Sequence, residues 1–400
     1  MTAVLCRHFG LKDIEIAEDI ASDTFLKASE HWAIHGIPEN PTAWLYTVAK
    51  NKAKDHFRRS SLFESDIKSH LKSAPSELEE VVAFDEQIIA DSQLAMIFAV
   101  CNPINSSENQ ICLALQILCG FSIKEIANAF LSKPEAIKKR LQRARTNLRN
   151  DNFKLVPLSE RGIASRLSIV LKTLYLLFNE GYFSKTNDNL IRKDLCCEAT
   201  RLTVLLTEHR STDTAEANAL LALMCFQSSR LDARTNDQGE YVLYDDQDRR
   251  LWDKSLIERG NFYLVKATDS KETSKYHLEA AIAYWHTTSD EEGKWKHILL
   301  LYNQLILIEY SPVTALNRTF ALAKAQGFEK AIAEAEKLNL KENSYYHKLQ
   351  GFLLSEINMD QAIYHFTQAI RLTCSNPEKQ LLIEEIARLE KRKAAAAENG

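Results

Sequence analysis

Residues 120–149, GFSIKEIANAFLSKPEAIKKRLQRARTNLR, constrain this chain more than any other stretch. Their pattern predicts two helices separated by a tight break near residues 131–133. The apolar residues that share one face of the first helix are Ile123, Ile126, Ala127 and Phe130. Those of the second are Ile137, Leu141, Ala144 and Leu148. Ser132 is a candidate cap, and Pro134 suits a first helical turn because its missing N–H would be unpaired there anyway. The pattern is typical of a helix-turn-helix.

The second helix is basic on the face opposite its apolar stripe. Residues 131–150 hold seven lysines and arginines against one glutamate, although the whole chain has a net charge of −4. This contrast favours a helix that lies in a DNA groove among phosphates. A solvated cationic face on an ordinary bundle helix is the alternative, because basic amphipathic helices are common. The basic residues of this face are Lys138, Lys139, Arg140, Arg143, Arg145 and Arg149.

Length and composition predict an all-α chain of two to four domains. The 400 residues include only 11 glycines and 8 prolines, and long alternating strand patterns are absent. No apolar run reaches about 18 residues, and the first residues lack a signal sequence, so we expect a cytoplasmic protein without a membrane span. Eight cysteines without a C-x-x-C pair predict buried free thiols.

Residues 11–30 predict an acidic amphipathic helix or a pair of such helices. Its inner side is expected to hold Ile16, Ile20, Phe25 and Ala28. Between Lys12 and Asp23, five acidic side chains stand against one lysine. Such a face fits a basic protein surface, although a merely soluble acidic face is the alternative.

Residues 31–40 predict a loop, and residues 41–59 predict a basic helix. The loop contains Gly36 and Pro38, which favour turns. Residues 45–60 hold five lysines and arginines against one aspartate. Trp44 is either a stacking platform for a base or part of the core, and the sequence favours the core.

Beyond residue 150, apolar helical stripes alternate with short polar joints. The expected helices cover residues 160–180, 191–208, 213–229, 249–268, 275–286 and 294–310. GFEKAIAEAEKL (327–338) and NMDQAIYHFTQAIRL (358–372) align at an offset of 31, and each follows another helix. Paired helices near a period of 34 are typical of tetratricopeptide repeats.

An acidic cluster in this half suggests two alternatives, a metal or acid–base site and a salt-bridged cap. Its members, with the nearby histidines, are Asp245, Asp246, Asp248, Asp253, His277, His286 and His297. No histidines stand in HExxH-like spacing, and no glycine-rich phosphate loop occurs. A salt-bridged cap with Arg249 and Arg250 is therefore favoured. We expect no enzyme activity, no catalytic residue, no metal and no cofactor.

The sequences of several segments resemble those of extracytoplasmic-function (ECF) sigma factors of the sigma-70 family. GFSIKEIANAF with KKRLQRARTNLR resembles their C-terminal domain, which reads the promoter −35 element. AEDIASDTFLKA (17–28) resembles the helix that grips core RNA polymerase, and residues 41–59 resemble the region that holds the −10 element. LYLLFNEGY (174–182), YDDQDRRLWDKSLI (244–257) and LEAAIAYWH (278–286) resemble the fused C-terminal domain of ECF group 42.

This resemblance implies site residues by position. For the −35 element they are Lys138, Lys139, Gln142 and Arg143. For the −10 element they are Asn40, Lys50, Asn51, Lys54 and Arg58. For core polymerase they are Glu18, Asp19 and Asp23. A flipped base of the non-template strand would be received by the loop at residues 35–40 and held by the basic helix.

The expected organisation is two small helical domains, joined by a linker, and a tetratricopeptide-like domain. The expected limits are 1–60 for sigma region 2, 61–84 for the linker, 85–150 for the sigma region 4 helix-turn-helix and 151–400 for the C-terminal domain. The expected partners are core RNA polymerase and promoter DNA. The C-terminal domain is expected to contact and modulate the sigma domains. The alternative function is a helical-repeat adaptor that binds DNA through its helix-turn-helix without polymerase.

Overall fold

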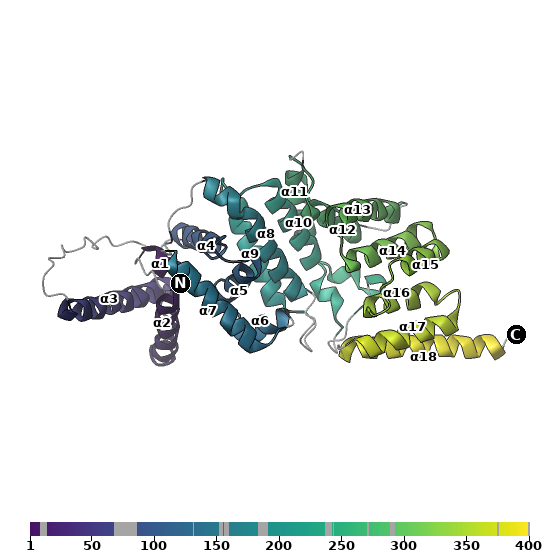
Figure 1. Ribbon diagram of the computed structural model, residues 1–400, viewed down its shortest axis with the longest axis horizontal. Coiled ribbons are helices and arrows are strands. Elements are labelled where there is room, and N and C mark those ends of the chain that lie inside the picture. The colour runs from purple at the N-terminus through teal and green to yellow at the C-terminus, as the bar shows by residue number, and fades with distance from the viewer. Residues whose placement is uncertain are drawn as a thin grey trace. The chain divides into compact units, whose positions relative to one another are not determined.

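The computed structural model describes the chain except for residues 9–13, 68–85, 131, 152–154, 156–159, 183–190, 237–241, 243, 270–271, 289–292, 374–375 and 399–400. Its described residues form eighteen α-helices and no β-strand, which confirms the all-α prediction (Figure 1). Among these residues, no helix combines the length and the apolar character that crossing a membrane requires.

The chain divides into two compact units, Met1–Thr173 and Leu174–Gly400. The helices of the first unit are α1 (Thr2–His8), α2 (Ile14–His35), α3 (Pro41–Ile67), α4 (Glu86–Val100), α5 (Ser107–Ile117), α6 (Ile123–Ala129) and α7 (Pro134–Asn150). The division falls inside α8 (Glu160–Tyr182). The expected domain limits at residues 60, 84 and 150 remain predictions. The first residues of the expected linker continue α3, and most of the others lie outside the described residues.

Helix α2 buries a stripe that contains Ile20 and Ala28 of the expected residues, whereas Ile16 is only half-buried and Phe25 is exposed. Ile14, Ala17, Ile20, Ala21, Thr24 and Ala28 are its buried residues. Phe25 was expected in the core but is 53% exposed, so that prediction is wrong. Thr24, four residues after Ile20, takes the inward position instead, and its hydroxyl donates to the Ile20 carbonyl oxygen at 2.7 Å. The helix also runs through His35, so the loop is shorter than expected.

Helices α4 to α7 pack together and form the second part of the first unit. Met96, Ile97 and Phe98 of α4 are almost fully buried, as are Ile111–Leu115 of α5. Arg166, on the part of α8 within this unit, donates to the Phe98 carbonyl oxygen at 3.0 Å. This contact places residues beyond Asn150 in the packing of the first unit.

The second unit begins with helices close to the expected ranges. They are α9 (Lys193–Glu208), α10 (Ala215–Ser228), α11 (Lys254–Lys266), α12 (Lys275–Thr287) and α13 (Lys294–Ile308). Every residue of α10 from Ala217 to Phe226 is buried, so this helix is central rather than amphipathic. Gly260 of α11 lets the Phe226 ring approach, because a Cβ at Gly260 would lie 2.6 Å from Phe226 Cε1.

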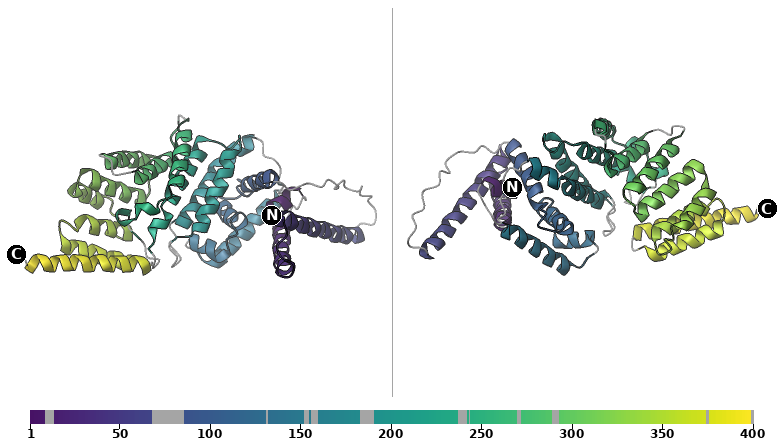
Figure 2. Two further views of the ribbon diagram at one scale, coloured as in Figure 1. Left: turned by 180° about the vertical axis from the view of Figure 1, so that it is seen from behind. Right: turned by 45° about the horizontal axis from the view of Figure 1, so that its top comes forward.

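The last five helices pack in chain order, as two views from other sides show (Figure 2). They are α14 (Pro312–Gln326), α15 (Phe328–Lys337), α16 (Ser344–Leu354), α17 (Met359–Leu372) and α18 (Asn376–Glu398). The two aligned sequence copies form α15 and α17, and each follows another helix. Ser311, Asn343 and Asn358 cap α14, α16 and α17 through their side-chain oxygens.

Candidate functional site

Helix α7 separates an apolar face from a charged one as the sequence predicts. Its buried residues are Ile137, Leu141, Ala144 and Leu148, each at most 3% exposed. Pro134 lies in the first turn, as expected. The residue that precedes the helix as its N-cap is Lys133, without a side-chain cap, so the expectation that Ser132 caps it is wrong.

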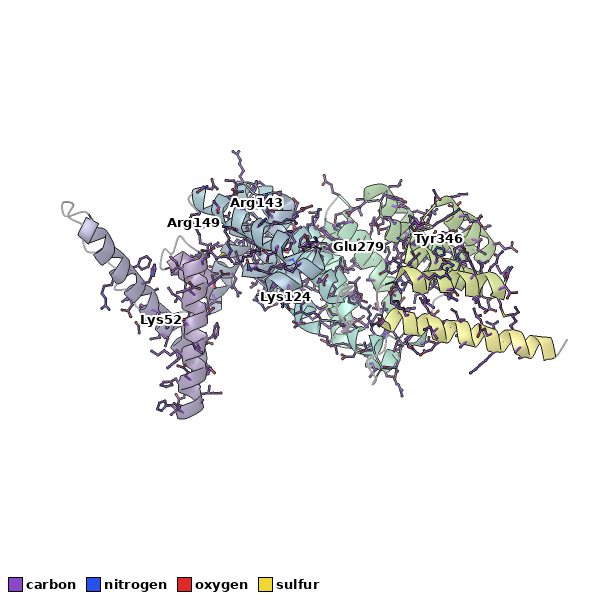
Figure 3. The ribbon with its side chains drawn as sticks, turned by 60° about the horizontal axis from the view of Figure 1, so that its bottom comes forward. Lys52, Lys124, Arg143, Arg149, Glu279 and Tyr346 are labelled. Carbon is purple, nitrogen blue, oxygen red and sulfur yellow. The ribbon has the colours of Figure 1, made fainter. Side chains whose placement is uncertain are left out.

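The four residues assigned to the −35 element lie on the outer face of α7. Lys138, Lys139, Gln142 and Arg143 are all exposed. Arg143 is labelled in Figure 3. Their spacing of one, three and four residues places them on neighbouring turns of one helical face. The structure therefore brings these four together and leaves their side chains accessible.

The buried side chain of Asn105 fixes how α7 is rotated. Asn105 lies between α4 and α5, and its Nδ2 donates to the Ala144 carbonyl oxygen at 3.1 Å. Asn147 Nδ2 donates in turn to Asn105 Oδ1 at 3.0 Å. Because Asn105 is only 3% exposed, loss of either bond would leave a buried polar group unpaired.

A reciprocal cap fixes the start of α6, the helix before the turn. The Ser122 N–H donates to Glu125 Oε2 at 2.8 Å, and the Glu125 N–H donates to Ser122 Oγ at 3.3 Å. This arrangement satisfies two N–H groups that a helix start leaves free. The Ser-x-x-Glu spacing was visible in the sequence but was not used there.

The remaining arginines of α7 are engaged with carboxylates. Arg140 Nη2 lies 3.0 Å from Glu108 Oε2 of α5. Arg145 Nη2 lies 2.9 Å from Glu18 Oε2, and Arg149 Nη2 lies 3.6 Å from Glu15 Oε2, both on α2. The basic face is thus split into an accessible row and a paired row.

Helix α3 carries most of the residues assigned to the −10 element on one face. Asn51, Lys54 and Arg58 are exposed at intervals of three and four residues, which keep this row aligned, and Lys50 next to Asn51 is half-buried. Arg58 pairs with Asp55 within the helix at 3.1 Å. Asn40 has a structural role as well, because its Oδ1 accepts from the Ala43 N–H at 2.9 Å at the start of α3.

A small aromatic group lies where α2 ends and α3 begins. The Trp44 ring is 5.5 Å from the Trp32 ring and 5.3 Å from the His31 ring, centroid to centroid. Trp44 is half-buried, so its exposure is intermediate between that of a core residue and that of an open stacking platform for a base. The buried Trp32 Nε1 has no hydrogen-bond partner among the residues that the structure describes.

The three carboxylates assigned to core polymerase differ in their surroundings. Asp19 is exposed, and Asp23 Oδ2 lies 3.0 Å from Lys52 Nζ of α3. Burial raises the pKa of Glu18 above its ordinary value, and the Arg145 guanidinium offsets part of that effect. The sequence did not predict the partners of these carboxylates. Lys52 pairs with Asp23, and Arg145 pairs with both Glu15 and Glu18.

The acidic cluster of the C-terminal half has structural roles. Asp248 Oδ2 accepts from Arg250 Nη2 at 2.8 Å, and Asp253 caps α11 by accepting from the Leu256 N–H at 3.1 Å. His277 takes part in the cap of α12 with Ser274. Among the described residues, no three His, Cys, Asp or Glu side chains are grouped as metal ligands would be.

His286 is held neutral in a cationic environment. Burial, together with Arg230 and Lys294, lowers its pKa to about 3. His297 instead stacks on the Trp285 ring at 4.7 Å. The cationic surroundings of His286 and the stacked ring of His297 favour packing roles for both histidines over acid–base chemistry.

Comparison with known proteins identifies two regions. Residues 3–62, which span α1 to α3, match the family model of sigma-70 region 2. Residues 166–268 match a family of unknown function, DUF6596. No solved structure matches the chain significantly.

Two curated proteins are similar over different lengths. The uncharacterized protein R00370 of Rhizobium meliloti is 34% identical over 403 residues, covering 98% of this chain and 94% of that protein. The ECF RNA polymerase sigma factor BldN of Streptomyces coelicolor is 32% identical over 125 residues, covering 30% of this chain and 45% of that protein. The chain therefore belongs to the same family as the Rhizobium meliloti protein, and its first three helices carry a match to sigma-70 region 2.

Proposed function

We propose that the chain is an ECF-type sigma factor that directs core RNA polymerase to specific promoters. The match of residues 3–62 to sigma-70 region 2 carries the proposal. The partial similarity to a Streptomyces ECF sigma factor supports it. The accessible basic row on α7, backed by its apolar stripe, supports a second contact with DNA.

In this proposal each surface of the first unit has its own role. Glu18, Asp19 and Asp23 on α2 bind core polymerase. Asn40 and the row on α3, which comprises Lys50, Asn51, Lys54 and Arg58, hold the −10 element. Helices α6 and α7 form the helix-turn-helix that binds the −35 element through Lys138, Lys139, Gln142 and Arg143.

The chain between the two DNA surfaces is long enough for this task. Promoter elements about 17 base pairs apart lie roughly 60 Å apart at 3.4 Å per step. Eighteen residues separate the end of α3 at Ile67 from the start of α4 at Glu86, and such a segment reaches roughly 60 Å when extended. Simultaneous binding of both elements is therefore sterically feasible.

The second proposal concerns the C-terminal half, which we assign to a tetratricopeptide-like domain of the group 42 type. Its support is the helix pairing of α14 with α15 and of α16 with α17, together with the aligned sequence copies. A tethered domain meets the sigma surfaces at an effective concentration near millimolar for a short linker, so even weak contacts would be occupied. We propose that it modulates transcription.

In vitro transcription tests the sigma assignment. Purified chain and core polymerase are incubated with a genomic promoter library, and start sites are mapped. A sigma factor yields starts at a shared motif only when the chain is present. If DNA binds but core polymerase neither co-purifies nor initiates, the alternative of a DNA-binding repeat adaptor is favoured.

Truncation tests the modulation. Ending the chain after Leu340 removes α16 to α18 and leaves the first unit intact, whereas a cut after Asn150 would also remove the Arg166 contact with Phe98. We expect transcription from the same promoter to change by several-fold. A soluble truncated chain that transcribes like the full chain would exclude a regulatory role for these three helices.

A further inference from the structure

Arg145 is largely buried for an ion-paired arginine, and it joins two surfaces assigned to different partners. Its side chain is 12% exposed, against 53% for Arg149 one turn later. Arg145 Nη2 donates to Glu18 Oε2 at 2.9 Å, and Nη1 lies 3.7 Å from Glu15 Oε1. Arg145 belongs to α7, whereas both glutamates belong to α2, 127 residues away along the chain for Glu18.

Gln116 of α5 orients the Arg145 side chain from the same side of the contact as α7. Arg145 Nη2 also donates to Gln116 Oε1 of α5 at 3.1 Å. Helix α5 packs on α7, so this bond holds the guanidinium in place toward α2. A pre-oriented guanidinium with several acceptors makes a stronger contact than a mobile surface pair does.

The contact is incompatible with the promoter-bound arrangement. Glu18 lies five residues before Asp23, about 8 Å along α2, and Asp23 pairs with Lys52 of α3. While Arg145 touches Glu18, α7 therefore stays within roughly 25 Å of the basic row on α3. The two promoter elements are roughly 60 Å apart, so α7 must leave α2 before both can be bound.

We propose that Arg145 with Glu15 and Glu18 forms an intramolecular clasp that competes with core polymerase for the acidic face of α2. The proposal rests on the proposed function, because Glu18 is one of the carboxylates assigned to polymerase. In the free chain the Arg145 guanidinium is ion-paired with the Glu18 carboxylate, so this carboxylate is not available to polymerase. Polymerase binding releases α7, and its accessible row becomes free to reach the −35 element.

Full-length variants test the clasp. Arg145→Gln keeps a polar group near Gln116 but removes the charge, and we expect its affinity for core polymerase to rise about five- to tenfold. Glu15→Gln, which leaves the assigned polymerase residues intact, should raise affinity in the same direction by a smaller factor. Arg201→Gln is the control, because Arg201 pairs with Glu198 inside α9 and the charge change is identical.

Small-angle X-ray scattering of the same free proteins gives an independent measurement. Opening the clasp should increase the radius of gyration of Arg145→Gln and leave that of Arg201→Gln unchanged. Should Arg145→Gln misfold by circular dichroism, Glu15→Gln carries both measurements.

The outcomes separate this proposal from the proposed function. Equal polymerase affinity for the wild type and both variants, or an unchanged radius of gyration, would overturn the clasp while the sigma assignment stands. Failure of the wild type and all variants to bind core polymerase would overturn the sigma assignment and the competition, and scattering would still report whether α7 is held on α2.

Discussion

Lys52 Nζ lies 3.0 Å from Asp23 Oδ2, and this ion pair joins the acidic helix α2 to the basic helix α3. Lys52 is labelled in Figure 3. Asp23 thus forms an ion pair within the chain while its side chain remains 65% exposed. A substitution at Asp23 would change both the α2–α3 contact and the surface charge. Asp19, which is exposed, separates the two effects more cleanly.

Charge reversal at Asp19 is the first prediction. Asp19→Lys should weaken binding to core polymerase by at least tenfold, because a like charge is placed against a basic surface. The free energy of unfolding should change by less than about 0.5 kcal/mol, since an exposed charge seldom holds a fold together. Co-purification and chemical denaturation measure the two quantities.

A charge swap provides the companion experiment. Asp23→Lys with Lys52→Asp keeps an ion pair between α2 and α3 but reverses the charge that α2 presents. Polymerase binding should fall as it does for Asp19→Lys. Binding equal to that of the wild type in both variants would exclude this face as the polymerase surface.

The outer row of α7 gives the second prediction. Arg143→Ala or Lys138→Ala should lower the affinity for a −35 probe by about 1–3 kcal/mol where the side chain reads a base, and by less where it touches only phosphate. Fluorescence anisotropy at fixed salt measures the affinity. Lys330→Ala, an exposed lysine of α15, is the control for charge alone. The assignment fails if both α7 variants bind like this control.

Glu279 gives a prediction on pH. Burial raises its pKa from 4.5 to about 7, while the Tyr175 hydroxyl, 3.2 Å away, and Lys275 offset part of this effect. Between pH 4.5 and 7 the folded state binds more protons than the unfolded state does, so this group's contribution to stability falls as pH rises. Glu279→Gln should therefore raise the free energy of unfolding at pH 7.5 by on the order of 2 kcal/mol and have little effect near pH 4.5.

The Glu279 measurement is the difference between variant and wild type across pH, because other groups also titrate. The buried His286, whose pKa is lowered to about 3, acts in the opposite sense and costs stability as pH falls below 6.5. Glu329→Gln, at an exposed position of α15, is the control. A constant difference at all pH values would contradict the assignment to Glu279.

The fourth prediction concerns the close approach of α16 and α17. A Cβ at Gly351 would lie 2.5–2.8 Å from three ring atoms of Phe366. Gly351→Ala should lower the free energy of unfolding by about 1–3 kcal/mol, although alanine is the better helix former. Thermal unfolding of the full chain measures this. In a Phe366→Leu background the same change should cost much less, and an equal cost in both backgrounds would rule out the ring as the cause.

Local pattern predicted most of the fold. The start of α7 at Pro134 and its four buried apolar residues followed from helical spacing, as did the limits of α12 within one residue. Phe25 was predicted to be buried because it is apolar, but its position along α2 places it outside the buried stripe. Thr24 can turn inward because its hydroxyl bonds to the preceding turn.

The site was less accessible to such reasoning. The residue types on the outer row of α7 showed its charge, and the Ser122–Glu125 cap was visible as a spacing. The pairing of Arg145 with Glu18 was not, because those residues are 127 positions apart and nothing local links them. Long-range contacts between charged residues depend on how helices pack, which periodicity does not specify.

The Asn105 network has a consequence for engineering. Lys138, Lys139, Gln142 and Arg143 lie on the outer face of α7, so their identities can be rewritten without disturbing the core. Asn147, on the same helix, cannot be rewritten freely, because its amide and the Ala144 carbonyl are the groups that hydrogen-bond to the Asn105 side chain. A graft that replaced the outer row alone and kept Asn147 would inherit the angle at which this scaffold presents α7, whereas exchanging the entire helix would lose that angle.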